Sequence, residues 1–432
     1  MRRVMTSSRS RIAREWCLRR FWSGYAYKRH ALAEVSPEIA ELRSRRPDAL
    51  ANAQLSFEAL LEPAEEGTFP FTERYAVAAF VAGIYQSTNA RDFYADLLAD
   101  DAPAELNAAV QEAIAHGISV GPYADAEGIS GDAAGFITFE SVAGLGERLV
   151  AAFDFAHLLV FHPKDAAPEA IGHLQAAGWS DDDIVTLAQL ISFLSFQLRV
   201  IHGLVVLGGS TACAPETESK EGVAKLGWQN HERTLTPDVH APEGFVNHSL
   251  GWKPWLAPLP KDEFTPEHTD ALIRPERIDS EYFRLLARDP AALKARTLTD
   301  LDIFYNTDGG MGRAERELAA TVVSRFNGCE FCASVHQQRS KDEGGDADAV
   351  DRLLFEGLDA DLGSEQWGVI RDASRELTRT PFAFNSGCVA KLRGVGFDDL
   401  AIIDLINSAS FFNWANRLML TIGAPDVPKR YR

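Results

Sequence analysis

The stretch GWSDDDIVTLAQLISFLSFQLRV, at residues 178–200, decides the fold class because its apolar residues recur at helical spacing along nearly its whole length. A similar stretch, GFDDLAIIDLINSASFFNWANRL, follows 218 positions later at residues 396–418. Both begin with glycine and an aromatic residue, and Arg199 falls opposite Arg417. We interpret the two stretches as copies of one buried helix, so the sequence predicts a tandem duplication.

A displacement of 242 positions gives a second match, which aligns residues 73–94 with residues 315–336 without a gap. Helical spacing of apolar residues also runs through residues 141–161, whereas convincing strands with alternating polar and apolar residues are scarce. Clusters of Asn, Asp and Gly, such as NTDGGMG at residues 306–312, separate the helical stretches. We therefore predict an all-α fold with two tandem helical domains.

The chain divides by composition into four predicted parts. Residues 1–30 hold nine Lys or Arg against one acid, Glu15, and no apolar run of signal-peptide length, so we expect a disordered tail; a transit peptide is the alternative. Glycine and proline accumulate after residue 208 without sustained periodicity, which predicts a linker whose Trp252 and Trp255 pack on a domain. The predicted parts are the tail (1–36), the first half (37–207), the linker (208–262) and the second half (263–432).

Charge and cysteine content narrow the classes of partner. The 432 residues include 43 Lys or Arg and 62 Asp or Glu, and the net charge of -19 argues against binding to nucleic acid or anionic lipid. The longest apolar segment, residues 190–209, contains Arg199 and His202, which are costly at the centre of a bilayer, so we expect a buried helix there and no membrane span. The five cysteines do not resemble a secreted disulfide framework, and a reducing cytoplasm fits them best: Cys17, Cys213, Cys329, Cys332 and Cys388.

The stretch NGCEFCASVH, at residues 327–336, carries the candidate chemistry. Asn327 and Gly328 form a predicted helix break and N-cap pair, and the helix that follows places the two cysteines and His336 on one face. Free N–H groups at a helix start stabilise a thiolate, and an imidazole one turn after Cys332 can take its proton. Cys329 is placed to close a disulfide with Cys332 after the latter is oxidised.

Glu317 lies on the preceding amphipathic helix, where its carboxylate could orient His336 if the two helices pack. The first half carries different side chains at the matching positions. Opposite Cys329, Cys332, His336 and Glu317 stand Ser87, Ala90, Tyr94 and Tyr75. We therefore expect the chemistry in the second half and a catalytically silent first half kept for assembly, the alternative being a diverged domain with its own ligand site.

Three interpretations of the cysteine pair compete. A structural zinc site needs a fourth ligand, and Cys388, the remaining cysteine of the second half, has neither a paired CxxC nor a neighbouring histidine. A helix core that contains two cysteines by chance leaves the histidine four residues further on unexplained. A redox-active dithiol accounts for all three side chains, so this interpretation is favoured.

The site motif resembles that of a known family. Glu317, the two cysteines and the histidine, followed by the helix at residues 396–418, resemble the carboxymuconolactone decarboxylase and alkylhydroperoxidase D (AhpD-like) superfamily. The preceding residues 282–310 resemble the leader of its peroxidase-related branch. The resemblance covers residues 252–425 well and the first half more weakly, as a tandem two-domain protein would show.

The resemblance implies an all-helical protein that reduces hydrogen peroxide or organic peroxides with a dithiol, without metal or flavin. Cys332 would be the peroxidatic cysteine, Cys329 the resolving partner and proton donor, and His336 with Glu317 the proton relay. Phe331 departs from the pattern, because some members carry a histidine there. The implied partners are a small-molecule peroxide, a thiol or disulfide-reductase electron donor and further copies of the chain in a homo-oligomer, with no cofactor besides the Cys329/Cys332 pair, no nucleic acid and no membrane.

Two rival functions remain open at this point. A lactone decarboxylase of the same superfamily would have no use for a CxxC pair. A non-catalytic redox sensor or scaffold would oxidise its dithiol without turnover.

Overall fold

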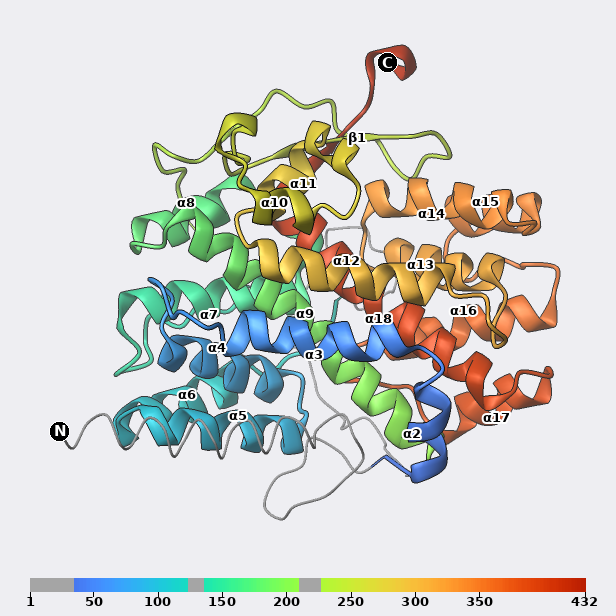
Figure 1. Cartoon of the computed structure of the whole chain (residues 1–432), viewed down its shortest axis with the longest axis horizontal. Helices are drawn as coiled ribbons and strands as arrows, with labels where there is room; N and C mark the ends of the chain where they lie inside the picture. The colour runs from blue at the N-terminus through green and yellow to red at the C-terminus, as the bar shows by residue number, and fades with distance from the viewer. Residues whose placement is uncertain (1–34, 123–135, 210–226) are drawn as a thin grey trace.

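The computed structural model describes residues 35–122, 136–209 and 227–432, and the regular secondary structure of this part is helical apart from one short pair of strands (Figure 1). The predicted all-α class is confirmed. Most of the predicted tail lies outside the described residues, as do Cys17 and Cys213.

The helices of the first half precede a linker that contains one strand, and those of the second half follow it. The first half contains α2 (Pro37–Arg43), α3 (Pro47–Leu61), α4 (Phe71–Ile84), α5 (Thr88–Asp101), α6 (Ala104–Gly117), α7 (Gly146–Phe161), the 3-10 turn η1 (Pro163–Asp165), α8 (Pro168–Ala176) and α9 (Asp181–Leu207). Then come β1 (Gly251–Pro254), η2 (Lys261–Glu263), α10 (Pro266–Ala271), η3 (Pro275–Asp279), α11 (Glu281–Leu286), α12 (Pro290–Tyr305), α13 (Arg313–Phe326), α14 (Glu330–Asp342), α15 (Ala347–Glu356), α16 (Glu365–Thr378), α17 (Ser386–Gly394), α18 (Asp399–Thr421), β2 (Gly423–Asp426) and η4 (Lys429–Tyr431).

Helices α9 and α18 form the centre of the molecule, with α4–α8 on one side of them and α13–α17 on the other, and α3 packs against α12 across the middle (Figure 1). Helix α9 is long and apolar enough to cross a bilayer, yet 83% of its most apolar window is buried inside the protein. Trp414 on α18 donates a hydrogen bond to Gln189 on α9 across 3.0 Å. The two helices approach closely at Gly203, where an added Cβ would lie 2.7 Å from Ile406. They therefore cover each other's apolar surface.

The helix bounds of the two halves correspond. Displacing α4 by 242 positions gives both ends of α13, and displacing α8 by 218 positions gives both ends of α17. The same displacements bring the start of α5 to that of α14 and the start of α9 to that of α18. The order from α3 to α9 is thus repeated from α12 to α18. This correspondence supports the predicted duplication, and the division into two domains stays a prediction.

Two buried arginines repeat the same contacts in the two halves. Arg199 on α9 donates to the carbonyl one turn earlier in its own helix (2.9 Å) and to that of Thr378 at the end of α16 (2.8 Å). Arg417 on α18 repeats both bonds, to the carbonyl one turn earlier (3.2 Å) and to Val160 near the end of α7 (3.3 Å). Because Val160 and Thr378 are 218 positions apart, each central helix holds an equivalent helix end of the opposite half.

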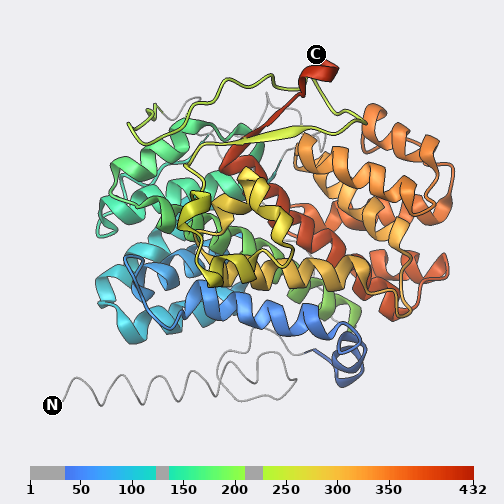
Figure 2. The same ribbon diagram turned by 45° about the horizontal axis from the view of Figure 1, so that its top comes forward.

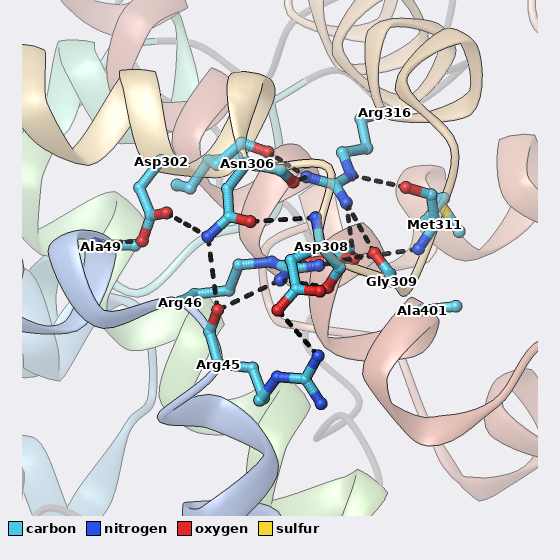
Figure 3. A network of polar contacts seen from close by, with 12 residues as sticks. Arg45, Arg46, Ala49, Asp302, Asn306, Asp308, Gly309, Met311, Arg316 and Ala401 are labelled. Carbon is cyan, nitrogen blue, oxygen red and sulfur yellow. Dashed lines mark hydrogen bonds and ion pairs between the residues drawn. The ribbon is translucent and has the colours of Figure 1, made fainter.

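A buried carboxylate fixes the entry to α13. Asp404 on α18 accepts two hydrogen bonds from Arg46 at the start of α3, both 2.8 Å, and one of 3.0 Å from Arg316 on α13. Each of the three side chains is only 1% exposed. Arg46 also donates to the carbonyls of Asp308 and Gly309 in the loop before α13 (Figure 3). One carboxylate therefore joins both halves and the loop that leads into α13.

The linker is attached to the helices by its two tryptophans and by a strand pair that the sequence did not predict. Strand β1 pairs antiparallel with β2, with Gly251 opposite Asp426. Trp252 donates from Nε1 to the carbonyl of Met419 (3.0 Å), and both Trp252 and Trp255 are buried, as predicted. Figure 2 shows the described part of the linker running across the top of the molecule.

We expect Asp404→Asn to lower the free energy of unfolding by about 3 kcal/mol or more, because two buried guanidinium groups lose their counter-charge. Urea denaturation of the full chain measures this change. The matched control is Asp308→Asn, which removes the exposed ion pair with Arg45 and should cost about 1 kcal/mol or less. Equal losses for the two variants would contradict the role assigned to Asp404.

Candidate functional site

The two cysteines lie at the turn that joins α13 to α14. Asn327 ends α13 as its C-cap, Gly328 adopts a φ of 73°, and Cys329 is the N-cap of α14. The prediction of Asn327 and Gly328 as an N-cap pair is therefore wrong. The left-handed glycine closes the first helix, since the Cys329 N–H still bonds back to the carbonyl of Ser324 (2.8 Å), so the new helix begins at the cysteine itself.

Both sulfurs are reduced and nearly covered, with 1% of Cys329 and 5% of Cys332 exposed. Burial raises the pKa of the Cys329 thiol well above its usual value, and its hydrogen bond to Cys332 and the charge of a Cys332 thiolate raise it further. Cys329 therefore holds its proton. Cys332 is the third residue of α14, where the free N–H groups of the first turn favour a negative charge.

The predicted contact between Glu317 and His336 is present. Nδ1 of His336 lies 2.5 Å from Oε2 of Glu317, which is completely buried on α13. Burial alone would raise the pKa of Glu317, but the charge and hydrogen bond of His336, with smaller effects of Arg339 and Arg313, hold it below its ordinary value. An ionised Glu317 keeps a proton on Nδ1, which leaves Nε2 to exchange a proton with a neighbour.

Aromatic rings enclose the imidazole. The ring of Phe412 packs edge to face on that of His336, with 4.1 Å between the ring centroids, and the centroid of the Phe304 ring lies 5.9 Å from that of His336. The helices α12, α13, α14 and α18 thus all contribute to the surroundings of one histidine. Such an apolar wall strengthens the electrostatic effect of Glu317 because little water competes for it.

Sequence reasoning missed Tyr282 on α11. Its hydroxyl is buried and has no hydrogen-bond partner among the described residues. Burial raises the pKa of Tyr282 to about 12, Arg296 opposes this shift, and the charges of Cys332 and Cys329 as thiolates add to it. The available signal was its position as the first residue of the segment that resembles the peroxidase-related leader.

Sequence reasoning also missed an ion pair between the halves. Glu330, between the two cysteines, is bound by Lys164 of η1 in the first half. Glu330 lies within the NGCEFCASVH stretch, and nothing in the local spacing connects it to a lysine 166 residues away.

The first-half counterparts of the site make packing and hydrogen-bond contacts. Ser87 is the N-cap of α5, as Cys329 is of α14, and Ala90 is fully buried. The hydroxyl of Tyr94 donates to Gln197 (2.6 Å), and that of Tyr75 to Glu62 (3.2 Å). These contacts satisfy the buried hydroxyl groups at the positions that match His336 and Glu317.

The described residues also bear on two of the predictions, those for a metal site and for Cys388. Within residues 35–122, 136–209 and 227–432, no group of three or more His, Cys, Asp or Glu side chains is arranged to hold a metal ion. Cys388 lies on α17, partly exposed, and burial raises its pKa.

The comparison with protein families matches the site segment. The model of the carboxymuconolactone decarboxylase family matches residues 290–370, from the start of α12 into α16, a range that contains the dithiol, His336 and Glu317. A search of curated proteins finds no match to the chain. Residues 290–370 are therefore similar to the carboxymuconolactone decarboxylase family, in agreement with the resemblance of the site motif.

Proposed function

We propose that the protein is a thiol-dependent peroxidase that reduces organic hydroperoxides or hydrogen peroxide through Cys332 and Cys329. The observation that carries the proposal is the arrangement of a hydrogen-bonded dithiol at the start of α14 beside the His336–Glu317 pair. The family match supports the coarser assignment to the superfamily. The dithiol and the relay support the redox chemistry.

In the first step, His336 accepts the Cys332 proton through Nε2, and the thiolate attacks the terminal oxygen of the hydroperoxide. A sulfur–oxygen bond forms, the oxygen–oxygen bond breaks, and the alkoxide leaves as the alcohol with the proton from His336. The peroxide is reduced by two electrons, and Cys332 becomes a sulfenic acid.

In the second step, the sulfur of Cys329 attacks that of Cys332. A disulfide forms, the sulfur–oxygen bond breaks, and the hydroxide leaves as water with the proton that Cys329 had retained. An external dithiol then returns two electrons and two protons. Glu317 remains ionised throughout and fixes the imidazole in the orientation that the first step uses.

The proposal includes the setting of the reaction. The electron donor is a thiol or a disulfide reductase, and the dithiol is the only redox group required. The protein acts in the cytoplasm as a homo-oligomer. A redox sensor would use the same dithiol without turnover, so steady-state peroxide consumption with a thiol donor separates the two functions. A lactone decarboxylase would leave the dithiol without a role.

Replacing Cys332 with serine should abolish peroxide turnover, because the attacking sulfur is lost. The Cys329→Ser variant should instead accumulate a sulfenic acid on Cys332, since no thiol resolves it. Peroxide consumption and mass spectrometry after trapping with a 1,3-diketone measure the two outcomes. Cys388→Ser is the matched control and should turn over like the parent; retained turnover in Cys332→Ser would refute the mechanism.

Glu317→Gln should slow the alkylation of Cys332 at pH 7 by roughly tenfold, because a neutral partner no longer stabilises the imidazolium that forms when His336 accepts the thiol proton. The rate of reaction with iodoacetamide between pH 5 and pH 10 measures it, with mapping of the modified cysteine. The folded-state pKa of Glu317 is depressed, so its ionised form stabilises the parent above the ordinary pKa, and this contribution is lost as the pH falls through the lower folded-state value. Parent-like rates in Glu317→Gln would remove the relay.

A further inference from the structure

We propose that the first half completes the dithiol site through Lys164, a positioning residue whose ammonium group neutralises Glu330 between the two cysteines. This inference rests on the proposed dithiol chemistry and names a residue that acts on it from the opposite half. It replaces the expectation that the first half is kept for assembly alone.

The framework holds Lys164 in place. Lys164 lies in η1, which directly follows α7 and packs against α18. Arg417 of α18 binds the carbonyl of Val160 near the end of α7, so the chain enters η1 from a fixed point. Nζ of Lys164 then contacts Oε1 of Glu330, the first residue of α14.

The burial of Glu330 makes its counter-charge necessary. Its side chain is 8% exposed, against 25% for that of Lys164. Its second oxygen, Oε2, meets no hydrogen-bond donor among the described residues. A buried carboxylate without a cation is strongly unfavourable and opposes any second negative charge beside it. The charge of Glu330 already contributes to the raised pKa of Cys329.

The two halves provide an internal comparison. The position that matches Glu330 in the first half is Thr88, and the one that matches Lys164 in the second half is Phe382. Neither side chain is charged, and the ring of Phe382 instead stacks on that of Tyr85, with 5.4 Å between the ring centroids. The arginine contacts that frame these positions are repeated, as described above, but the ion pair is not. The fold does not require the pair, which occurs at the turn that carries the sulfurs.

The titratable groups around the dithiol and its neighbours determine the expected signs. They include Lys164 of η1, Tyr282 of α11, Glu317 of α13, and Glu330 with His336 of α14. Helix α12 adds Arg296 near Tyr282 and Asp300 near His336. Removing Lys164 leaves Glu330 to oppose a thiolate. Removing Glu330 leaves Lys164 to favour one, so the two substitutions should act in opposite directions.

The test measures the alkylation of Cys332 by iodoacetamide against pH in the full chain. Lys164→Met should raise the midpoint of the alkylation rate against pH by about one pH unit, and Glu330→Gln should lower this midpoint. The double variant should lie near the parent, and Lys164→Arg should restore the parent's midpoint. Lys341→Met is the matched control, because Lys341 lies on the same helix α14 in an ion pair with Asp351 and should leave the midpoint unchanged.

Shifts of the same sign in Lys164→Met and Glu330→Gln, or shifts no larger than in Lys341→Met, would overturn the proposal. If Lys164→Met does not fold, Glu330→Gln decides: a downward shift supports the proposal and an unchanged midpoint overturns it. Alkylation needs no peroxide, so opposite shifts in a protein without turnover would refute the peroxidase and keep the role of Lys164. Peroxide turnover in the parent with unchanged alkylation midpoints in the variants would support the peroxidase and overturn the role of Lys164.

Discussion

The packing of α9 against α18 is the contact on which the rest of the structure depends. Both helices are buried nearly all round, so protein covers every side of each. Each covers the other, and each uses one buried arginine to hold a helix end of the opposite half. A buried guanidinium must find acceptors, so these bonds also fix where α7 and α16 end. These two helices thereby join the two halves.

Local spacing predicted the features that depend on local chemistry. Residue periodicity sets the side of a helix that faces the core. It predicted the helical class, the displacements of 242 and 218 positions, and the common face of Cys329, Cys332 and His336. The Glu317–His336 contact followed from the assumption that consecutive helices pack. The break at Asn327–Gly328 was placed correctly, but the N-cap of α14 is Cys329, because glycine serves equally well in a break before a helix and in the closure of the helix before it.

Contacts between distant segments could not be predicted in the same way. Strands β1 and β2 are four residues each and lack an alternating pattern, and their pairing depends on the approach of the linker to the end of α18. Lys164 has the sequence context of an ordinary surface lysine, and only the fold brings it to Glu330. The hydroxyl of Tyr282 is enclosed in a similar way by segments far apart in the chain. The candidate site is thus local in its reactive groups and non-local in the charges that surround them.

The close approach of Gly203 and Ile406 has a consequence for which halves can pair. The matching positions are Ala188 for Ile406 and Thr421 for Gly203, so small and large side chains are distributed unequally between the two copies. Two first halves packed in this geometry would set Gly203 against Ala188 and leave a void, whereas two second halves would force Ile406 against Thr421. Packing density alone therefore favours the mixed pair. A single chain that carries one copy of each kind always has the correct mate within reach, and neither copy needs to remain self-complementary as its sequence changes.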